Sequence, residues 1–284
     1  MPGFRKLLDQ VRFFYQITWR LQSLYALQAK IYRETVFEAE RARDPLSLTT
    51  HGFTAYSQAD EDGMIQELFR RIGPTDRRFI EFGCGDGLEN NTVYLLLTGW
   101  NGLWMDGSAE GIRNIRAQFA PYVDSGRLQA KQGFLTRDSI NGAIHEAGYT
   151  GEIDLLSIDV DGNDYWLWEA LTVVTPRVVI IEYNATFRPP HKIVQAYDEN
   201  YRWNFTNYYG ASLKALEELG ARKGYDLVGC CYAGTNAFFV RQDLTKDLFS
   251  RPFTAEHHYR EPQHDAFVRG AMRHRKAVGK YQIL

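Results

Sequence analysis

The 284-residue sequence contains little cysteine, no long hydrophobic run and almost no excess of one charge. Its cysteines, Cys84, Cys230 and Cys231, have neither the number nor the spacing of a disulfide framework or a zinc site, which indicates a reducing compartment. No apolar run reaches the roughly 18 residues that a membrane span requires, and the sequence does not open on an apolar block followed by a small-residue cleavage site. We therefore expect a cytoplasmic protein.

The formal net charge of -2 at pH 7 gives no overall attraction to nucleic acid, so we expect no nucleic-acid partner. A chain of this length can form one main domain with a smaller appendage, because domains usually contain roughly 100 to 200 residues. We expect an N-terminal helical extension at 1–50, a core domain at 51–250 and a surface extension at 251–284.

Residues 4–43 lack proline and glycine, which predicts one or two helices that end near Pro45. The first 33 residues carry six Lys or Arg against a single Asp, interleaved with aromatic residues. Three uses of this segment remain open: packing on the protein's own core or on a second copy in a homo-oligomer, contact with the inner face of an anionic membrane, and docking of a glycan or other partner. A stripe with 3/4 spacing would face the partner: Phe14, Ile17, Leu21, Leu24, Gln28, Ile31 and Thr35.

From residue 60 onward, helical and strand-like patterns alternate, which predicts a Rossmann-like, doubly wound and mostly parallel sheet. Helices are predicted at 60–71, 90–98, 109–120, 137–147, 164–171 and 211–223. The last two strands are too close for an intervening helix and predict an antiparallel hairpin at one sheet edge. Strands are predicted at 79–82, 102–105, 128–131, 153–158, 178–183, 225–230 and 236–240.

A glycine-rich turn, EFGCGDG at 81–87, follows the first predicted strand of the core. Gly83 and Gly85 would let the backbone approach a ligand at the carboxyl end of that strand. Glycine occupies alternate positions, whereas the dinucleotide fingerprint requires G-x-G-x-x-G, so the turn does not favour a pyrophosphate. The turn therefore indicates a ligand of another kind.

Asp106 ends the next predicted strand, at the place where an acid can accept hydrogen bonds from both hydroxyls of a ribose. Glu81 precedes the glycine-rich turn and adds a second acid. The combination favours a nucleoside that has no phosphate and carries a cationic amino-acid tail. S-adenosylmethionine is such a cofactor.

Five segments carry a resemblance to a known family: SQADEDGMI, FIEFGCGDGLENNT, GWNGLWMDGS, IDLLSIDVDGNDYWLW and VVIIEYN. Over roughly residues 55–245 the sequence resembles the FkbM-type branch of the class I S-adenosylmethionine-dependent methyltransferases. The resemblance implies a seven-stranded sheet with a reversed last strand. It also implies methylation of a hydroxyl on a sugar or a natural product, often in glycan or polyketide pathways.

The resemblance further implies a set of cofactor-binding residues. Gly83 and Gly85 would line the methionine end together with Glu81, and Asp106 would hold the ribose. The segment before the first core helix would fold over the cofactor, and the turn after the third strand would lie beside the adenine. The full set comprises Gln58, Glu81, Gly83, Gly85, Asp106, Gly133, Phe134 and Asp159.

Polar side chains also gather after the fourth and fifth predicted strands, in SIDVDGND and IEYN. Carboxylates this close repel one another unless a cation or a shared proton separates them, so a purely structural or cofactor-contacting network is the alternative to a metal site. Oxygen ligands of this kind suit Mg²⁺, with Mn²⁺ or Ca²⁺ as alternatives. The arrangement is similar to the magnesium site of the catechol O-methyltransferase type, except that a tyrosine separates the acid from the asparagine. The expected metal ligands are Asp159, Asp161, Glu182 and Asn184.

A divalent ion on the acceptor hydroxyl would lower its pKa and direct it toward the methyl group. A base would complete such a site, and His191 is the first choice at neutral pH, with Asp161 second. The alternative for His191 is an ordinary loop histidine. The expected catalytic residues are therefore Asp161, His191 and Glu182.

Several other residues invite simpler interpretations. Asn90, Asn91 and Thr92 are expected to cap the helix after the glycine-rich turn. Aromatic residues in 197–209 lie among polar neighbours and would shape a sugar-binding acceptor pocket. Four histidines lack ligand-like spacing and are expected to be exposed: His257, His258, His264 and His274.

The leading hypothesis is a methyltransferase that uses S-adenosylmethionine to methylate a sugar hydroxyl of a glycan or its precursor, assisted by a divalent ion. Methylation of a small natural-product hydroxyl is the second enzymatic interpretation. A non-catalytic glycan-binding module on the same fold is the alternative from another class. A nicotinamide-dependent oxidoreductase is disfavoured by the glycine spacing.

Overall fold

The computed structural model describes residues 2–263 and 274–284, with side chains from residue 10 onward. His264 and part of the expected C-terminal extension lie outside the described residues. The chain divides into two compact units, Met1–Pro45 and Leu46–Leu284. The seven strands of the main sheet all belong to the second unit.

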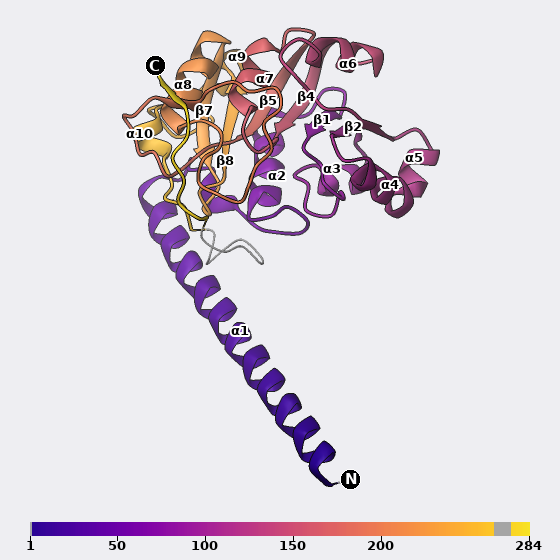
Figure 1. Ribbon diagram of the computed structural model, residues 1–284. Coiled ribbons are helices and arrows are strands. Elements are labelled where there is room, and N and C mark those ends of the chain that lie inside the picture. Colours follow the sequence, from indigo (N-terminus) through magenta and orange to yellow (C-terminus); the bar gives the residue numbers. More distant parts are fainter. Residues whose placement is uncertain (1, 264–273) are drawn as a thin grey trace. The chain divides into compact units, whose positions relative to one another are not determined.

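The first unit is one long helix, α1 (Pro2–Arg43), coloured indigo in Figure 1. It contains no acidic residue in its first turn and ends with Arg41 and Arg43 in its last, where cations interact favourably with the helix dipole. Many large apolar side chains along it are exposed, including Phe14, Leu21 and Leu24. Within the described residues, none of the helices combines the length and the apolar character needed to cross a bilayer.

The second unit is built on a seven-stranded sheet in the order β3-β2-β1-β4-β5-β8-β7 (Figure 1). Strand β8 runs antiparallel to both of its neighbours, while the other adjacent pairs are parallel. This confirms the predicted Rossmann-like fold and the terminal hairpin. The strands are β1 (Arg78–Phe82), β2 (Asn101–Asp106), β3 (Leu128–Gln132), β4 (Gly151–Ile158), β5 (Val174–Glu182), β7 (Tyr225–Cys230) and β8 (Asn236–Arg241).

Helices connect the strands as the alternating pattern predicts. The stretch predicted as one helix at 109–120 is two helices, because the chain turns at Phe119, whose backbone is not helical. A two-stranded sheet, β6 (Ile193–Gln195) with β9 (Tyr281–Ile283), joins the segment after β5 to the C-terminus. The helices are η1 (Thr49–His51), α2 (Glu61–Ile72), α3 (Val93–Leu97), α4 (Ala109–Gln118), α5 (Ala120–Asp124), α6 (Ile140–Glu146), α7 (Asp164–Ala170), α8 (Leu213–Arg222), α9 (Gln242–Thr245) and α10 (Ala255–His258).

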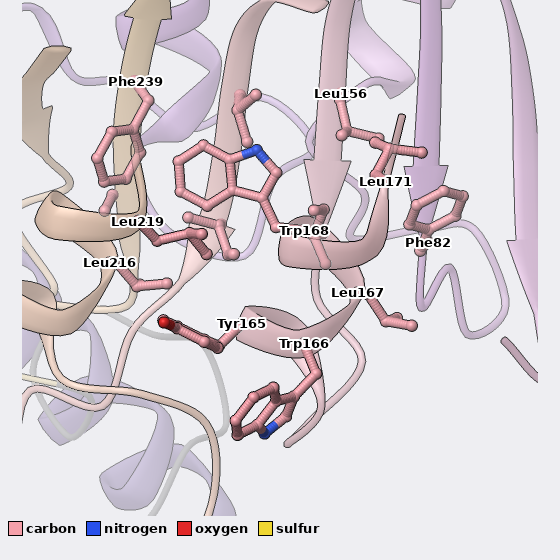
Figure 2. Packing of buried hydrophobic residues seen from close by; sticks show 14 of the residues in the cluster. Phe82, Leu156, Tyr165, Trp166, Leu167, Trp168, Leu171, Leu216, Leu219 and Phe239 are labelled. Carbon is pink, nitrogen blue, oxygen red and sulfur yellow. The ribbon is translucent and has the colours of Figure 1, made fainter. Parts of the chain in front are cut away.

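Two hydrophobic clusters cover the two faces of the sheet, because successive strand residues point to opposite faces. Ile80 and Phe82 of β1 face the cluster to which α6, α7 and α8 contribute, whereas Phe79 faces the cluster of α2 and α4. Trp168 packs 4.9 Å from Phe239 between ring centres, as Figure 2 shows. Truncating such a buried aromatic residue to alanine typically costs about 3–5 kcal/mol.

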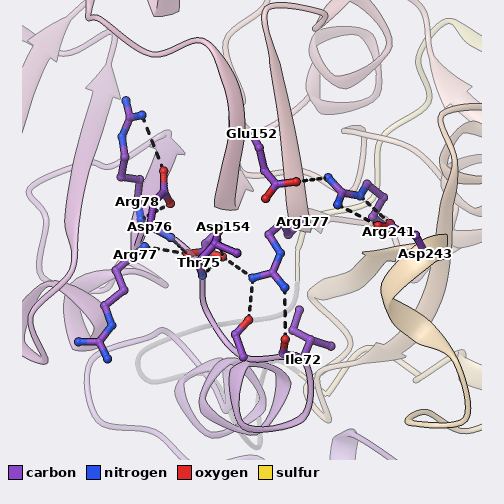
Figure 3. Close-up of polar contacts among 11 residues, drawn as sticks. Ile72, Thr75, Asp76, Arg77, Arg78, Glu152, Asp154, Arg177, Arg241 and Asp243 are labelled. Carbon is purple, nitrogen blue, oxygen red and sulfur yellow. Dashed lines mark hydrogen bonds and ion pairs between the residues drawn. The ribbon is translucent and has the colours of Figure 1, made fainter.

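A buried ion pair joins β4 and β5 away from their carboxyl ends. The Arg177 guanidinium donates to Asp154 at 2.6 Å, and Asp154 also accepts the backbone N–H groups of Thr75 and Arg77 (Figure 3). Removing one partner of a buried pair costs about 3–5 kcal/mol because the other charge is left uncompensated. These charges therefore fix the loop that leads into β1.

Candidate functional site

The glycine-rich turn after β1 lies directly against the end of β4. A side chain on Gly83 would place its Cβ 1.5 Å from the backbone oxygen of Asp159, so Gly83 is required by the protein's own packing. Gly85 differs, since no heavy atom lies within 4 Å of its would-be Cβ, and its φ of +51° suits glycine. The sequence predicts an open approach at both glycines, but the structure shows it only at Gly85.

Asp106 ends β2 and ties two loops together. Its carboxylate accepts the backbone N–H of Gly85 at 2.8 Å with one oxygen and that of Ser108 at 2.6 Å with the other. Each carboxylate oxygen can accept a further hydrogen bond, and the side chain is only half-buried. Asp106 can therefore hold the glycine-rich turn and still accept two hydroxyl protons from a ligand.

Glu81 is buried and has partners inside the protein. Its carboxylate accepts the backbone N–H groups of Asn91 at 2.8 Å and Thr92 at 3.2 Å, and also the Thr92 hydroxyl. Burial raises the pKa of Glu81 to about 7, although these donors oppose the shift. The expected capping of α3 by the side chains of Asn90, Asn91 and Thr92 is wrong, because the N-cap residue Thr92 makes no side-chain cap bond and directs its hydroxyl to Glu81.

The segment before α2 is held in a tight turn by Asp62. Its buried carboxylate accepts the backbone N–H groups of Ala55, Tyr56 and Ser57 at 2.7–2.8 Å. Gln58, which the resemblance assigns to the cofactor, is exposed on this turn. Asp62 therefore has a structural role that leaves Gln58 accessible.

Gly133 and Phe134, which the resemblance assigns to the adenine, lie close to Asp106 and Gly107. The N–H of Gly133 donates to the Asp106 backbone oxygen at 2.9 Å, and the Phe134 ring lies near Gly107. Phe134 is 43% exposed, and the Arg202 guanidinium lies over its ring. An aromatic face is therefore present at the end of β3, next to the half-buried carboxylate of Asp106.

Three carboxylates come together at the ends of β4 and β5. Asp159, Asp161 and Glu182 each offer an oxygen that lies within 4.8 Å of the other two. One Glu182 oxygen is buried and accepts no hydrogen bond from the described residues. A buried polar atom without a partner is costly unless an ion or water satisfies it, so this oxygen fits a cation.

The three carboxylates repel one another. Burial, followed by the charges of the other carboxylates, raises the pKa values of Asp159 and Glu182 well above their ordinary range. Withdrawal from water and the charges of Asp164 and Asp106 raise the pKa of Asp161 to about 6, while part of its side chain stays exposed. The group can carry its full negative charge at neutral pH only if a cation compensates it.

Two other expected participants have different tasks. Asn184 is buried, and its amide donates to the backbone oxygens of Asn207 and Tyr209 at 3.0 and 2.8 Å, so it positions a loop. Its oxygen also accepts the N–H of Thr186 at 3.1 Å, which makes Asn184 a poorer metal ligand than expected. His191 is exposed, and only its backbone is hydrogen-bonded within the described residues. Its imidazole is therefore not held against the carboxylates.

A cavity of about 410 Å³ lies after the end of β5, and Asn207 and Tyr209 of the predicted acceptor segment 197–209 line part of it. Its walls come from the segment after β5, from the loop before α8 and from the C-terminal region, which no local pattern connects. The structure contradicts two of the expected exposures of histidines in this region. His258 is buried, and His274 is half-buried because its ring packs against Trp203 and Tyr209. His257 is exposed, as expected. Lining residues include Thr186, Arg188, Asn207, Tyr209, Glu261 and Lys276.

Gln195 is a feature that the sequence did not reveal. It is fully buried on β6, and neither atom of its amide group has a hydrogen-bond partner among the described residues. Its side-chain oxygen lies 3.1 Å from the would-be Cβ of Gly162, the residue that follows Asp161. An unsatisfied amide next to the carboxylates is typical of a site that holds water or a ligand.

Solved structures similar to this chain include several methyltransferases. An S-adenosylmethionine-dependent methyltransferase from Clostridium acetobutylicum is 10% identical over 74% of this chain and 99% of its own, with a TM-score of 0.40. An O-methyltransferase from Bacillus cereus, in complex with SAH, is 16% identical over 73% and 89%, with a TM-score of 0.42. WbdD is 15% identical over 64% and 39%, with a TM-score of 0.38. No protein-family model matches the chain, and no curated protein does.

Proposed function

We propose that this protein is an S-adenosylmethionine-dependent O-methyltransferase that acts on a sugar hydroxyl of a glycan or glycan precursor, with the help of a divalent ion. One observation carries the proposal: the glycine-rich turn touches Asp159 through Gly83, so the expected cofactor loop adjoins the three carboxylates. In folds of this type, ligands bind at the carboxyl ends of the strands, where these features lie.

The cofactor would lie along the ends of β1, β2 and β3. Asp106 would accept the two ribose hydroxyls, and the open space at Gly85 would admit the methionine end. Phe134 offers a partly exposed ring for the adenine, with Gly133 beside it. Glu81 would support the cofactor site indirectly, because its buried carboxylate binds the backbone of Asn91 and Thr92. Gln58 is exposed on the segment before α2 and could contact the cofactor there.

A divalent ion would be held by Asp159, Asp161 and Glu182. The donor set is oxygen only, which suits Mg²⁺, Mn²⁺ or Ca²⁺, and the unpartnered Glu182 oxygen fits this assignment. When bound, such an ion lowers the pKa of a coordinated hydroxyl and fixes its direction. Asn184 would not bind the ion directly, since its amide group holds the backbone of Asn207 and Tyr209 in place.

Methyl transfer is an in-line displacement. The acceptor oxygen forms a bond to the methyl carbon while the carbon–sulfur bond breaks, and the electron pair stays on sulfur as S-adenosylhomocysteine leaves. Asp161 is the most accessible of the three carboxylates, and it would take the proton of the acceptor hydroxyl as the general base. His191, the first choice of base from the sequence, is exposed and would have to approach the carboxylates to take this role.

The acceptor assignment to a sugar follows the resemblance and the aromatic and amide side chains around the cavity. A small natural-product hydroxyl is the alternative acceptor, and a non-catalytic glycan-binding module is the alternative function. Outside the core, we assign the N-terminal extension to contact with a second copy or an anionic membrane surface. The C-terminal region contributes to the cavity wall.

Incubating the protein with methyl-labelled S-adenosylmethionine and a set of candidate glycans tests the proposal. Mass spectrometry should show one labelled methyl group on an acceptor, and addition of EDTA should suppress it. The Asp106→Ala variant serves as the negative control. Glycan binding that survives Asp106→Ala, with no labelled product from any acceptor, would support the non-catalytic module instead.

A further inference from the structure

The cavity lined by Thr186, Asn207 and Tyr209 is large enough for a saccharide. Its volume of about 410 Å³ exceeds that of a single sugar ring, and the residues that line it include Tyr209, Tyr259 and Asn207. Aromatic faces combined with amide and hydroxyl groups are a typical environment for carbohydrate. The cavity is therefore a suitable acceptor site for the proposed reaction.

Tyr209 links this cavity to the carboxylates. The phenol is almost completely buried, and its pKa is raised well above the ordinary value by burial and by the charges of Glu182 and Asp159. The chain also runs directly from Glu182, at the end of β5, to Thr186 in the cavity wall. Tyr209 and the segment from Glu182 to Thr186 thus connect the cavity wall to the three carboxylates that would receive the reacting hydroxyl.

The rim carries the opposite charge. Among the described residues that line the cavity, the cations Arg188 and Lys276 accompany one acid, Glu261. Arg188 is 2.6 Å from Glu261, and both side chains are more than half exposed. Lys276 is exposed and forms no salt bridge with an acid in the described parts of the chain.

We propose that the acceptor is an anionic saccharide, whose carboxylate or phosphate is recognised by Lys276, assisted by Arg188, while its hydroxyl end faces Asp161. The inference rests on the proposed function and names its substrate class. A negative substituent complements the charge of the lysine, which a neutral sugar does not. Arg188 contributes a forked donor that suits a carboxylate or a phosphate.

Binding to immobilised saccharides in matched pairs tests this proposal, with the full-length protein saturated with S-adenosylhomocysteine so that no turnover occurs. One member of each pair carries a carboxylate or a phosphate, and the other carries a hydroxyl at the same position. Stronger binding to the acidic member is expected, and the preference should weaken as salt is raised. Separate carboxylate pairs and phosphate pairs identify which anion is recognised.

Charge reversal of the lysine provides the decisive comparison. Lys276→Glu should lower the preference for acidic members by at least about five-fold, as expected for an exposed ion pair that is replaced by repulsion. Lys280→Glu is the matched control, because Lys280 is exposed in the same segment but does not line the cavity. The Lys280→Glu variant should prefer the acidic members of the pairs as strongly as the unaltered protein does.

Three results would overturn the anion proposal: equal binding to both members of each pair, no binding to any acidic member, or a preference that Lys276→Glu leaves unchanged. Calorimetric titration of the same samples with S-adenosylmethionine separates this failure from that of the proposed function. Intact cofactor binding together with any of these results removes the anion proposal alone. Absent cofactor binding removes the proposed function.

Discussion

The guanidinium carbon of Arg202 lies 3.6 Å from the centre of the Phe134 ring. Arg202 belongs to the loop between β6 and α8, which contributes to the cavity, and Phe134 belongs to the turn after β3, where the adenine is expected. The pair therefore joins the acceptor side of the candidate site to the cofactor side. Because both side chains are exposed, the contact can contribute only modestly to stability.

Removing this contact should affect the cofactor more than the fold. We expect Arg202→Ala to raise the Kd for S-adenosylmethionine about three-fold, in line with an exposed cation–π contact, and to leave the midpoint of urea unfolding nearly unchanged. Arg251→Ala is the matched control, since Arg251 lies over Phe253 away from the site. Equal effects of the two substitutions on the Kd would show that the Arg202 contact has no connection with the cofactor.

Glu81 should make stability depend on pH. Its ordinary pKa of 4.5 is raised to about 7 by burial, so the folded protein binds a proton more tightly than the unfolded chain. The free energy of unfolding should therefore fall as pH rises from 4.5 to 7, by an amount on the order of 3 kcal/mol from this group, and then stay level.

The Glu81→Gln variant should lose this part of the pH dependence, because the amide does not ionise. Urea unfolding at pH 5 and at pH 7.5 measures the difference, and the exposed Glu89→Gln variant controls for an ordinary surface carboxylate. If the unaltered protein and Glu81→Gln change in parallel between the two pH values, Glu81 does not have the raised pKa that its burial indicates.

Local sequence patterns sufficed for the strands and for the ends at which Asp106, Asp159 and Glu182 lie, because strand periodicity and chain order decide those positions. They could not identify side-chain partners. Glu81 was expected to face a ligand but binds Asn91 and Thr92, and this choice depends on how the loop folds back. The sequence predicted that 197–209 shapes a pocket, but it could not identify the other walls, since residues 185 and 276 meet only in three dimensions.

The cluster of Asp159, Asp161 and Glu182 should bind an ion but should lower the stability of the protein when no ion is bound. Asp161→Asn removes one of three mutually repelling charges, and asparagine tolerates the positive φ of 57° at this position. In EDTA at pH 7 we expect the variant to be more stable by about 1 kcal/mol, which corresponds to roughly 2–4 °C in Tm.

The same variant should bind Mn²⁺ or Mg²⁺ at least about ten-fold more weakly, because a charged ligand is lost. Differential scanning calorimetry and calorimetric metal titration give the two readouts, with the exposed Asp124→Asn as control. An Asp161→Asn variant that is less stable in EDTA and binds the ion normally would contradict a role for Asp161 in the metal group.

The exposed stripe on α1 should mediate self-association. Its 3/4 spacing matches the heptad repeat of a coiled coil, and Leu21 and Leu24 are 61% and 62% exposed. We expect a dimer by sedimentation velocity at micromolar concentration, and a monomer after combined Leu21→Lys and Leu24→Lys substitution. The control pair Gln22→Lys and Ala26→Lys lies outside the stripe and should stay dimeric. A monomeric unaltered protein that binds anionic vesicles would instead support the membrane alternative.

The central claim is that Asp106 and the glycine-rich turn hold S-adenosylmethionine. Isothermal titration calorimetry of the full-length protein and of Asp106→Ala tests it most directly, with Asp124→Ala as an exposed control. The unaltered protein and the control should bind the cofactor, and Asp106→Ala should weaken binding at least about ten-fold, because hydrogen bonds to a charged group are lost. No heat at millimolar cofactor, or an affinity that Asp106→Ala leaves unchanged, would contradict the account.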